Sequence, residues 1–534
     1  MKVWKSPVFY FGILLVMVIA GLLSAPYVID WNSYRADLEA YGKKLTGRPV
    51  KIEGPVSVQL FPWPKLAAEN VSLANPPGLD AAEFAHADRI VVRMTLAGLA
   101  RGGIDVQSVD IEGPSVHFER LATGEGNWQF QPAADLIKSD VLSRVSLDQI
   151  RLQDGTVTFS DRRRGETFRL DDVNASVTSP GITGPWRLRA LALHDDRSVD
   201  ISLSTGIWTA SDPFRFGLRV AAADGSGLVF SFDGTTDGSQ AQGELRIEPA
   251  TTDDGKGDAE GKVRPLVMTS KVDATFDQIN MQALEIAPQD PKQGGAVTTG
   301  SASFKLGQHI DAKADLKSAM LDLDELAGAK SRTLLREAGS LALADSLLRL
   351  LPSDMSLAGS VSVSALKTGG ETLENVRLAV EADSNALRIK EFSTGLPGRS
   401  QMLFKGIYFP GAQGAEIAGE LAVEASDLRQ LVQWLWPEAR ASIASLWTGS
   451  RGRFKLQTDL SITAARLHFS KAQYELDGEQ GTAALSVTPA GRGAVDLRID
   501  GNRIDIDNYM PQGVSALSAA ASQGAGGAET PCGM

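Results

Sequence analysis

The chain has 534 residues and a net charge of −12, with 65 acidic against 53 basic side chains. A single compact core stops growing well below this length, so two or more structural units are expected. The negative charge would repel phosphate backbones, which argues against nucleic acid as a partner. Because Cys532 is the one cysteine, an intrachain disulfide framework and a thiolate metal cluster within one subunit are both excluded.

The first feature along the chain is an uncharged run over residues 8–29. Such a run is long enough to cross a bilayer core as a helix. Lys2 and Lys5 precede it, so the positive-inside rule places residues 1–7 in the cytoplasm and the bulk of the chain on the other side. A cleaved signal peptide is the alternative. The length of the run, and Pro26 at the best cleavage site, favour an uncleaved single-pass anchor.

Two elements are expected directly after this run. Residues 31–45 carry apolar side chains at helical spacing and predict an amphipathic helix. Residues 47–66 then read GRPVKIEGPVSVQLFPWPKL, where apolar residues take alternate positions from Val50 to Leu60. This period of two predicts a half-buried strand. The Phe61-Pro62-Trp63-Pro64 run ends it, because proline cannot donate to a ladder.

Alternating segments recur further along the chain. In residues 106–118, Gly113-Pro114 predicts either two short strands or one bulged strand. Residues 150–159 read IRLQDGTVTF and predict a hairpin, in which a turn at Asp154-Gly155 would bring the two apolar halves onto one face. A second hairpin is expected about residues 162–166. Successive short strands joined in this way indicate a long meandering antiparallel sheet.

The second half of the chain combines strands with two helical stretches. Residues 454–501 alternate like a set of strands, whereas residues 321–351 and 426–447 have the apolar spacing of helices. Residues 251–262 lack apolar side chains and predict a linker. Residues 513–534 are rich in Ala, Ser and Gly and predict a disordered tail. The expected parts are therefore an anchor over residues 1–30, a first β region over 31–250, the linker, a second β region with helices over 263–512, and the tail.

No motif in the sequence indicates catalysis. The five histidines lie far apart, and none has a metal-binding spacing. Residues 255–262 are similar to a phosphate-binding loop, but Val263 stands where such a loop carries Ser or Thr. We therefore expect no enzymatic activity, no cofactor and no metal. The one strongly basic cluster, Arg162-Arg163-Arg164, is read either as a contact for an anionic headgroup or as a solvated hairpin tip.

With these features in view, the chain resembles the AsmA family of inner-membrane-anchored bacterial proteins. The resemblance rests on the N-terminal apolar run followed by GRPVKIEGPVSVQLFPWPKLAAENVSLANPPG, on GEGNWQF at residues 124–130, and on hairpin-like segments such as IRLQDGTVTF. It extends to IDIDNYMP at residues 504–511. Many relatives continue beyond this last motif, where this chain gives way to its low-complexity tail. A shortened family member is one interpretation.

The resemblance implies a location in the envelope of a diderm bacterium, a long curved β-sheet with an open hydrophobic groove and a few covering helices, and a role in outer-membrane biogenesis through phospholipid movement. The expected partners are then phospholipid and, through residues 8–29, the inner membrane. The alternative is an anchored envelope scaffold or regulator of outer-membrane protein assembly that carries no lipid. In the first interpretation, the side chains expected to face the groove are Val50, Ile52, Val56, Val58, Leu60, Ile150, Leu152, Val157 and Phe159.

Overall fold

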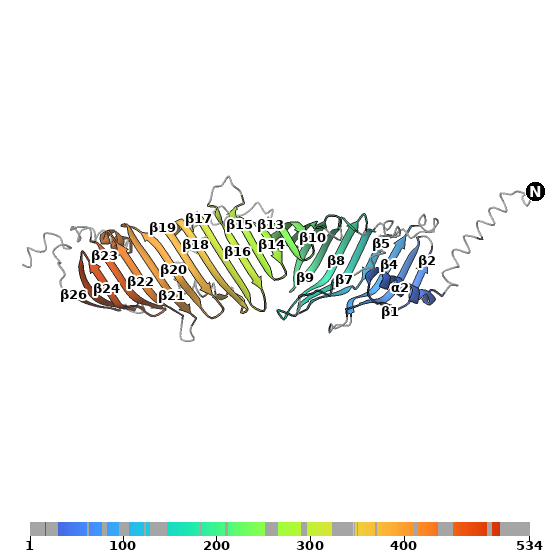
Figure 1. The fold of residues 1–534 in the computed structure, drawn as a ribbon, viewed down its shortest axis with the longest axis horizontal. Coiled ribbons are helices and arrows are strands. Elements are labelled where there is room, and N and C mark those ends of the chain that lie inside the picture. Colours follow the sequence, from blue (N-terminus) through green and yellow to red (C-terminus); the bar gives the residue numbers. More distant parts are fainter. Residues whose placement is uncertain are drawn as a thin grey trace, which may run out of the picture. The chain divides into compact units, whose positions relative to one another are not determined.

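The alternating sequence folds into long strands throughout the part of the chain that the structure describes (Figure 1). This computed structural model describes residues 17, 30–60, 63–76, 79, 83–95, 106–121, 124–128, 147–181, 183–208, 212–250, 265–289, 296–322, 345, 348–349, 351–368, 371–410, 415–435, 452–488 and 494–501. The chain divides into two units. Unit 1 comprises residues 1–255, 266–281 and 306–308, and unit 2 comprises residues 256–265, 282–305 and 309–534. The expected linker, 251–262, and the expected tail, 513–534, lie outside the described residues.

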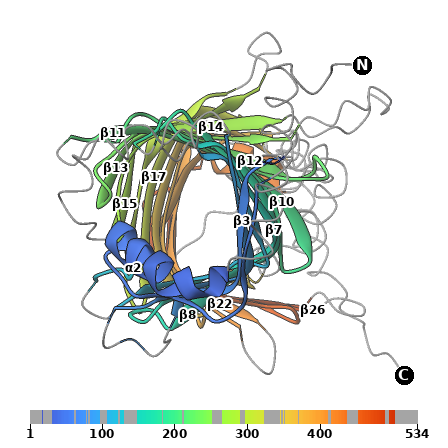
Figure 2. The same ribbon diagram turned by 90° about the vertical axis from the view of Figure 1, so that its right-hand side faces the viewer.

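The expected N-terminal helix is confirmed. It consists of η2 (Trp31–Tyr34) and α2 (Arg35–Thr46), and it ends where Gly47 adopts a left-handed φ of 74°. Figure 2 shows α2 beside the first strands of unit 1, at the end of the ladder that faces the viewer. Among the described residues, no helix is both long and apolar enough to cross a membrane. The expected span over residues 8–29 lies outside them, apart from Met17.

Unit 1 is a ladder of hydrogen-bonded strands. Its first two strands, β1 (Val50–Ile52) and β2 (Val56–Gln59), both pair with β3 (Lys65–Ala74), so Gly54-Pro55 splits the single strand expected there. The ladder continues through β4 (Glu83–Met94), β5 (Val106–Glu112), β6 (Ser115–Arg120), β7 (Leu147–Asp161), β8 (Glu166–Ser179), β9 (Arg187–His194), β10 (Arg197–Thr205), β11 (Phe214–Ala222), β12 (Leu228–Thr236), β13 (Gln240–Pro249) and β14 (Leu266–Thr275).

The hairpin expected within residues 150–159 is wrong, because this segment lies inside one strand, β7. Asp154 has a φ of 55° and falls at an irregularity in the pairing of β7 with β8. A bulge moves the following side chains to the other face, so the same sequence alternation fits a bulge and a turn equally well. The second expected hairpin is confirmed, because residues 162–165 form the turn between β7 and β8.

The sheet is also mixed, whereas an antiparallel sheet was expected. β7 runs parallel to both β5 and β6, and in unit 2 β17 (Ile310–Asp322) runs parallel to β18 (Met355–Thr368). Parallel neighbours need a long crossover connection, and long segments separate β6 from β7 and β17 from β18. Local alternation of side chains carries no information about strand direction, which is why the sequence does not predict these pairs.

Unit 2 continues with antiparallel pairs from β18 onward. Its strands are β15 (Gln278–Pro288), whose first residues belong to unit 1, β16 (Thr298–Leu306), β17, β18, β19 (Glu371–Ala382), β20 (Leu387–Leu396), β21 (Ser400–Phe409), β22 (Glu416–Ala425), β23 (Phe454–Thr463), β24 (Leu467–Leu476), β25 (Glu479–Thr488) and β26 (Ala494–Gly501). Within the expected helix 426–447, α8 (Leu428–Leu435) is observed. The expected helix 321–351 starts too early, because Leu321 and Asp322 belong to β17. Asp345, Leu348 and Arg349 are helical.

A closed core in unit 2 surrounds Tyr408, whose side chain is fully buried. Leu348, Phe404 and Ile417 belong to the same buried cluster. The Tyr408 hydroxyl donates to Asp345 Oδ1 at 3.3 Å. The helical Leu348 therefore covers the apolar face of strands β19 to β22 at this point.

We expect Tyr408→Phe to lower the stability of unit 2 by about 1 kcal/mol, because it removes one hydrogen bond. Tyr408→Ala should cost about 3–5 kcal/mol, because it also leaves a cavity. Hydrogen exchange of the β20 to β22 amides in the full chain measures both changes. Equal losses in the two variants would contradict a packing role for the ring.

Candidate functional site

Two unbroken rows of apolar side chains cross one face of the unit 1 ladder. Each member pairs with the next on the neighbouring strand, so the rows run across the sheet, perpendicular to the strands. The first row is Val58, Leu66, Val92, Val109, Ile150, Val177, Leu188, Leu203, Leu218, Phe232 and Leu245. The second row is Val56, Ala68, Ile90, Ile111, Leu152, Ala175, Ala190, Ile201, Val220, Phe230, Ile247 and Met268. We call them the apolar rows.

The opposite face of the same strands is polar. Its matching row is Asp110, Arg151, Ser176, Arg189, Ser202, Arg219, Ser231, Arg246 and Thr269. The alternation of faces thus persists from β5 to β14. A sheet with one wet face and one dry face must bury the dry one against something.

The apolar face is nevertheless not closed over like a core. Every member of the first apolar row is half-buried rather than buried, and Phe230 in the second row is 44% exposed. Side chains sealed beneath a second layer would be buried throughout, as Tyr408 is in unit 2. The described part of unit 1 therefore presents a long apolar surface that is partly open.

A hollow of about 350 Å³ lies on this face. Volumes of this size are typical of small-molecule sites, which are mostly apolar. Its lining comes from β1 and from β3 to β8, and includes Val50, Ile111, Leu152, Val157 and Val173. Thr46, at the end of α2, also contributes.

Next to the hollow, a short loop carries the deeply buried Asn127, which is 1% exposed. Its side-chain oxygen accepts from the Glu119 amide at 2.8 Å, and its amide nitrogen donates to the His117 carbonyl at 2.7 Å and to Asn75 Oδ1 at 3.0 Å. Its own carbonyl accepts from Arg48 Nη2 at 2.6 Å. Asn127 therefore ties β6, the end of β3 and the start of β1 together.

Trp128 follows Asn127 and lies on the apolar face. Its ring centroid is 6.2 Å from that of Phe118 and 6.0 Å from that of Phe159. These two phenylalanines pair across β6 and β7, two residues beyond the hollow-lining Val116 and Val157. The loop therefore limits the hollow at one end, as α2 does at β1.

The residues predicted to face a groove all come from strands or strand ends at this end of unit 1. Val50, Leu152 and Val157 line the hollow. Val56, Val58, Ile150 and Leu152 belong to the apolar rows. Ile52 and Val56 pack with Trp31 and Leu38, so the N-terminal helix covers them. Phe159 lies under Trp128, and Leu60 follows β2 and is half-buried.

Sequence reasoning missed the roles of Asn127, Trp128 and Arg48. The available signal was the resemblance itself, because GEGNWQF contains Asn127 and Trp128 and GRPV contains Arg48. Apart from the resemblance, these three positions belong to no helical or strand-like pattern of apolar residues. Their importance comes from contacts across many strands, which local patterns do not encode.

Comparison with known proteins bears on the same part of the chain. A model of the AsmA family matches residues 1–248. Residues 1–248 belong to the AsmA family. This AsmA-family region contains α2, the hollow, the Asn127 loop and most of the apolar rows.

The chain is similar to the AsmA family protein YhjG of Escherichia coli (strain K12), with 26% identity over 166 residues. The match covers 28% of this chain and 24% of the relative, so it spans about a quarter of the relative's length. No solved structure matches the chain.

Within the described residues, the two rims of the unit 1 ladder meet at the end of β6. β7 ends and β8 begins at the first rim, and β14, seven strands further along, ends at the second. A twist of about 20–25° per strand accumulates to roughly 140–175° over that distance, which lets opposite rims approach. Figure 2 shows these strands curling round a common interior. Arg120 at the end of β6 donates to Asp277 Oδ1 at 2.6 Å and to the Phe276 carbonyl at 3.1 Å.

Aromatic contacts reinforce this meeting of the rims. The rings of Trp128 and Phe276 lie 5.8 Å apart, and the Arg120 guanidinium lies 5.3 Å from the Phe276 ring. Because Trp128 also stacks on Phe159, the contact lies over the apolar face. We call Arg120, Trp128, Phe276 and Asp277 the clasp. The hydrogen bond from Arg120 holds the pKa of Asp277 below its ordinary value, because it stabilises the charged carboxylate.

The arginine cluster does not form a free cationic patch in this structure. Arg162 contacts Glu119, Arg163 contacts Asp277, and Arg164 contacts Glu166. Each guanidinium therefore already faces a carboxylate. The headgroup interpretation loses its main support, and the cluster instead strengthens the turn beside the clasp.

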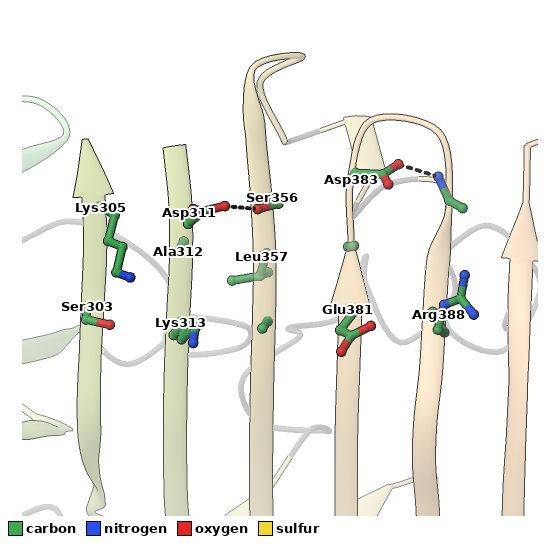
Figure 3. A pocket seen from close by; sticks show the side chains of 13 residues that line it. Ser303, Lys305, Asp311, Ala312, Lys313, Ser356, Leu357, Glu381, Asp383 and Arg388 are labelled. Atoms are coloured by element: carbon green, nitrogen blue, oxygen red, sulfur yellow. Dashed lines mark hydrogen bonds between the residues drawn. The ribbon is translucent and has the colours of Figure 1, made fainter. Parts of the chain in front are cut away.

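A larger hollow of about 480 Å³ lies in unit 2, where side chains from β16 to β20 surround it (Figure 3). It is polar and has both signs of charge: Lys305, Lys313 and Arg388 stand beside Asp311, Glu381 and Asp383. Asp311 accepts from Ser356, and Asp383 accepts from the Ala386 amide. These balanced charges on a sheet surface select no particular ligand. The apolar face of unit 1 is the stronger candidate site.

Proposed function

We propose that this protein is an inner-membrane-anchored periplasmic protein of outer-membrane biogenesis, and that it shields phospholipid acyl chains along the apolar rows of unit 1. The observation that carries the proposal is the continuity of those rows over successive strands, with mostly half-buried apolar side chains on one face and a polar row on the other. Membership of residues 1–248 in the AsmA family supports the envelope role.

A phospholipid that crosses an aqueous compartment needs such a surface for its acyl chains. Exposure of an acyl chain to water costs about 0.8 kcal/mol per CH₂, or on the order of 13 kcal/mol for a chain of roughly sixteen carbons. An apolar face lined by Val, Ile, Leu and Phe removes most of that cost and leaves the headgroup in water. Because the described residues show no nucleotide-binding motif, the driving force for net movement would come from another component.

The second candidate is an envelope scaffold that carries no lipid. The observation in its favour is the closed Tyr408 cluster, where Leu348 covers the apolar face of unit 2. A scaffold would bury its apolar surface against its own helices or a partner protein. The two functions therefore differ in whether the unit 1 rows contact lipid.

Photo-crosslinking in cells separates these candidates. A benzophenone amino acid at Ile201 or Val220, on an apolar row, is expected to capture labelled phospholipid. Its matched controls are the neighbouring Ser202 and Arg219 on the polar face, where capture should be at least fivefold lower. Equal capture at all four positions, or none at Ile201 and Val220, would rule out the acyl-chain proposal.

A further inference from the structure

The clasp has a fixed side and an exposed side. At the first rim, the side chains of Arg120 and Asp161 are only 4% and 8% exposed, and Arg120 Nη1 lies 3.3 Å from Asp161 Oδ2. At the second rim, Asp277 is 58% exposed and Phe276 is 42% exposed. The latter two residues form the tip between β14 and β15. Buried charged groups on the first rim thus contact a tip on the second rim whose two side chains are about half exposed.

Separation of the two sides leaves no buried charge without a counter-ion. Arg120 keeps Asp161, and Asp277 already faces solvent. Trp128 keeps its contacts with Phe118 and Phe159 after Phe276 leaves. A permanent buried ion pair behaves differently, because removing one partner strands the other in a low-dielectric site. The clasp therefore has the energetics of a reversible contact.

The clasp lies beside the hollow on the apolar face. It spans the opposite rims of the ladder over the apolar face, directly beyond the Val116 and Val157 wall of the hollow. The other limits of the hollow are α2, which packs against β1, and the Asn127 loop, which is held by buried hydrogen bonds. Of these boundaries, the tip at Phe276 and Asp277 is the one that reaches across from the opposite rim.

We infer that the clasp is a releasable latch. When Phe276 and Asp277 leave Trp128 and Arg120, an acyl chain enters or leaves the apolar face of unit 1 sideways, between its two rims. This inference rests on the proposed function for the chemistry of the occupant, an acyl chain. It adds the route of entry and the residues that control it.

Stapling the latch tests the route. In a Cys532→Ser background, the pair Arg163→Cys and Asp277→Cys is bridged by a short bifunctional maleimide, because Arg163 meets Asp277 across the rims. The control staple joins Ser160→Cys to Thr167→Cys, neighbours on β7 and β8 whose hydroxyls lie 3.3 Å apart on one rim. The probe is pyrene-labelled phosphatidylglycerol in phosphatidylethanolamine vesicles. We expect the first staple to slow uptake by the full-length protein at least tenfold and the second to leave it unchanged.

An opened latch should have the reverse effect. Asp277→Ala removes an exposed group, so the fold should persist, and uptake should become several-fold faster. Spin labels at Ser198→Cys and Ser239→Cys, on opposite rims, should report a broader and longer distance in this variant, with no lipid needed. Uptake through the stapled rims at the unstapled rate, or an unchanged label distance in Asp277→Ala, would overturn the latch. Absence of uptake by the wild-type protein would instead count against the proposed function, while the label distance still decides the latch.

Discussion

Replacement of Leu152 by glutamate is expected to reduce the phospholipid that copurifies with the protein at least tenfold. Leu152 lines the hollow and pairs with Ile111 and Ala175 in the second apolar row. An acyl chain over this position would have to desolvate a carboxylate, which costs several kcal/mol, and about 1.4 kcal/mol already corresponds to a tenfold loss of occupancy. Quantification of lipid phosphorus per mole of purified protein measures the effect.

The matched control places the same charge on the other face. Ser176 lies on β8, beside Leu152 in the ladder, and pairs with Arg151 and Arg189 in the polar row. Ser176→Glu should therefore leave the lipid content unchanged. Because Leu152 is half-buried, its variant should keep its circular dichroism spectrum. Equal lipid contents in the two variants would show that the apolar rows do not hold the copurifying lipid.

Much of this site could be predicted from local sequence. The alternation of Val56 with Val58, and of Ile150 with Leu152, places apolar side chains on one face because successive residues of a strand point to opposite sides. Those residues do belong to the apolar rows. The spacing of Leu38 and its neighbours likewise predicts the helix that covers Ile52.

The errors arise where one pattern fits two geometries. Asp154-Gly155 has the composition of a tight turn, but a bulge at Asp154 gives the same change of face. Once β7 is read as one long strand, its two halves lie beside β5 and β6 instead of folding onto each other. Propensity alone cannot separate these outcomes, because the deciding hydrogen bonds come from strands that are distant in the sequence.

The clasp lies further beyond local reasoning. Arg120 and Asp277 are 157 positions apart, and they meet only because twist accumulates along the ladder between them. Nothing in either segment marks the pair, since an arginine at a strand end and an aspartate in a turn are both ordinary. Contacts of this kind depend on the summed geometry of many strands.

Asn127→Ala is expected to destabilise unit 1 by about 3 kcal/mol or more. The substitution removes three part-buried side-chain hydrogen bonds and leaves the Glu119 amide and the His117 carbonyl without those partners. Each polar group that loses its partner away from water costs about 1–3 kcal/mol. For a unit of this size the loss corresponds to a fall in Tm of roughly 6–12 °C. Thermal unfolding measures the fall in Tm, and hydrogen exchange of the β6 and β7 amides measures the loss of stability in unit 1.

The control for Asn127 is another asparagine in the same unit. Asn174 on β8 is exposed, and its amide donates to the neighbouring Asp172, so water can replace its contacts. Asn174→Ala should therefore change Tm much less. Since Arg48 and Trp128 depend on the same loop, Asn127→Ala should also weaken the Trp128 contact with Phe276 and speed lipid uptake. A destabilised variant with unchanged uptake would separate the loop's structural role from the latch, whereas an unchanged Tm would contradict the assignment of Asn127 as the tie between β1, β3 and β6.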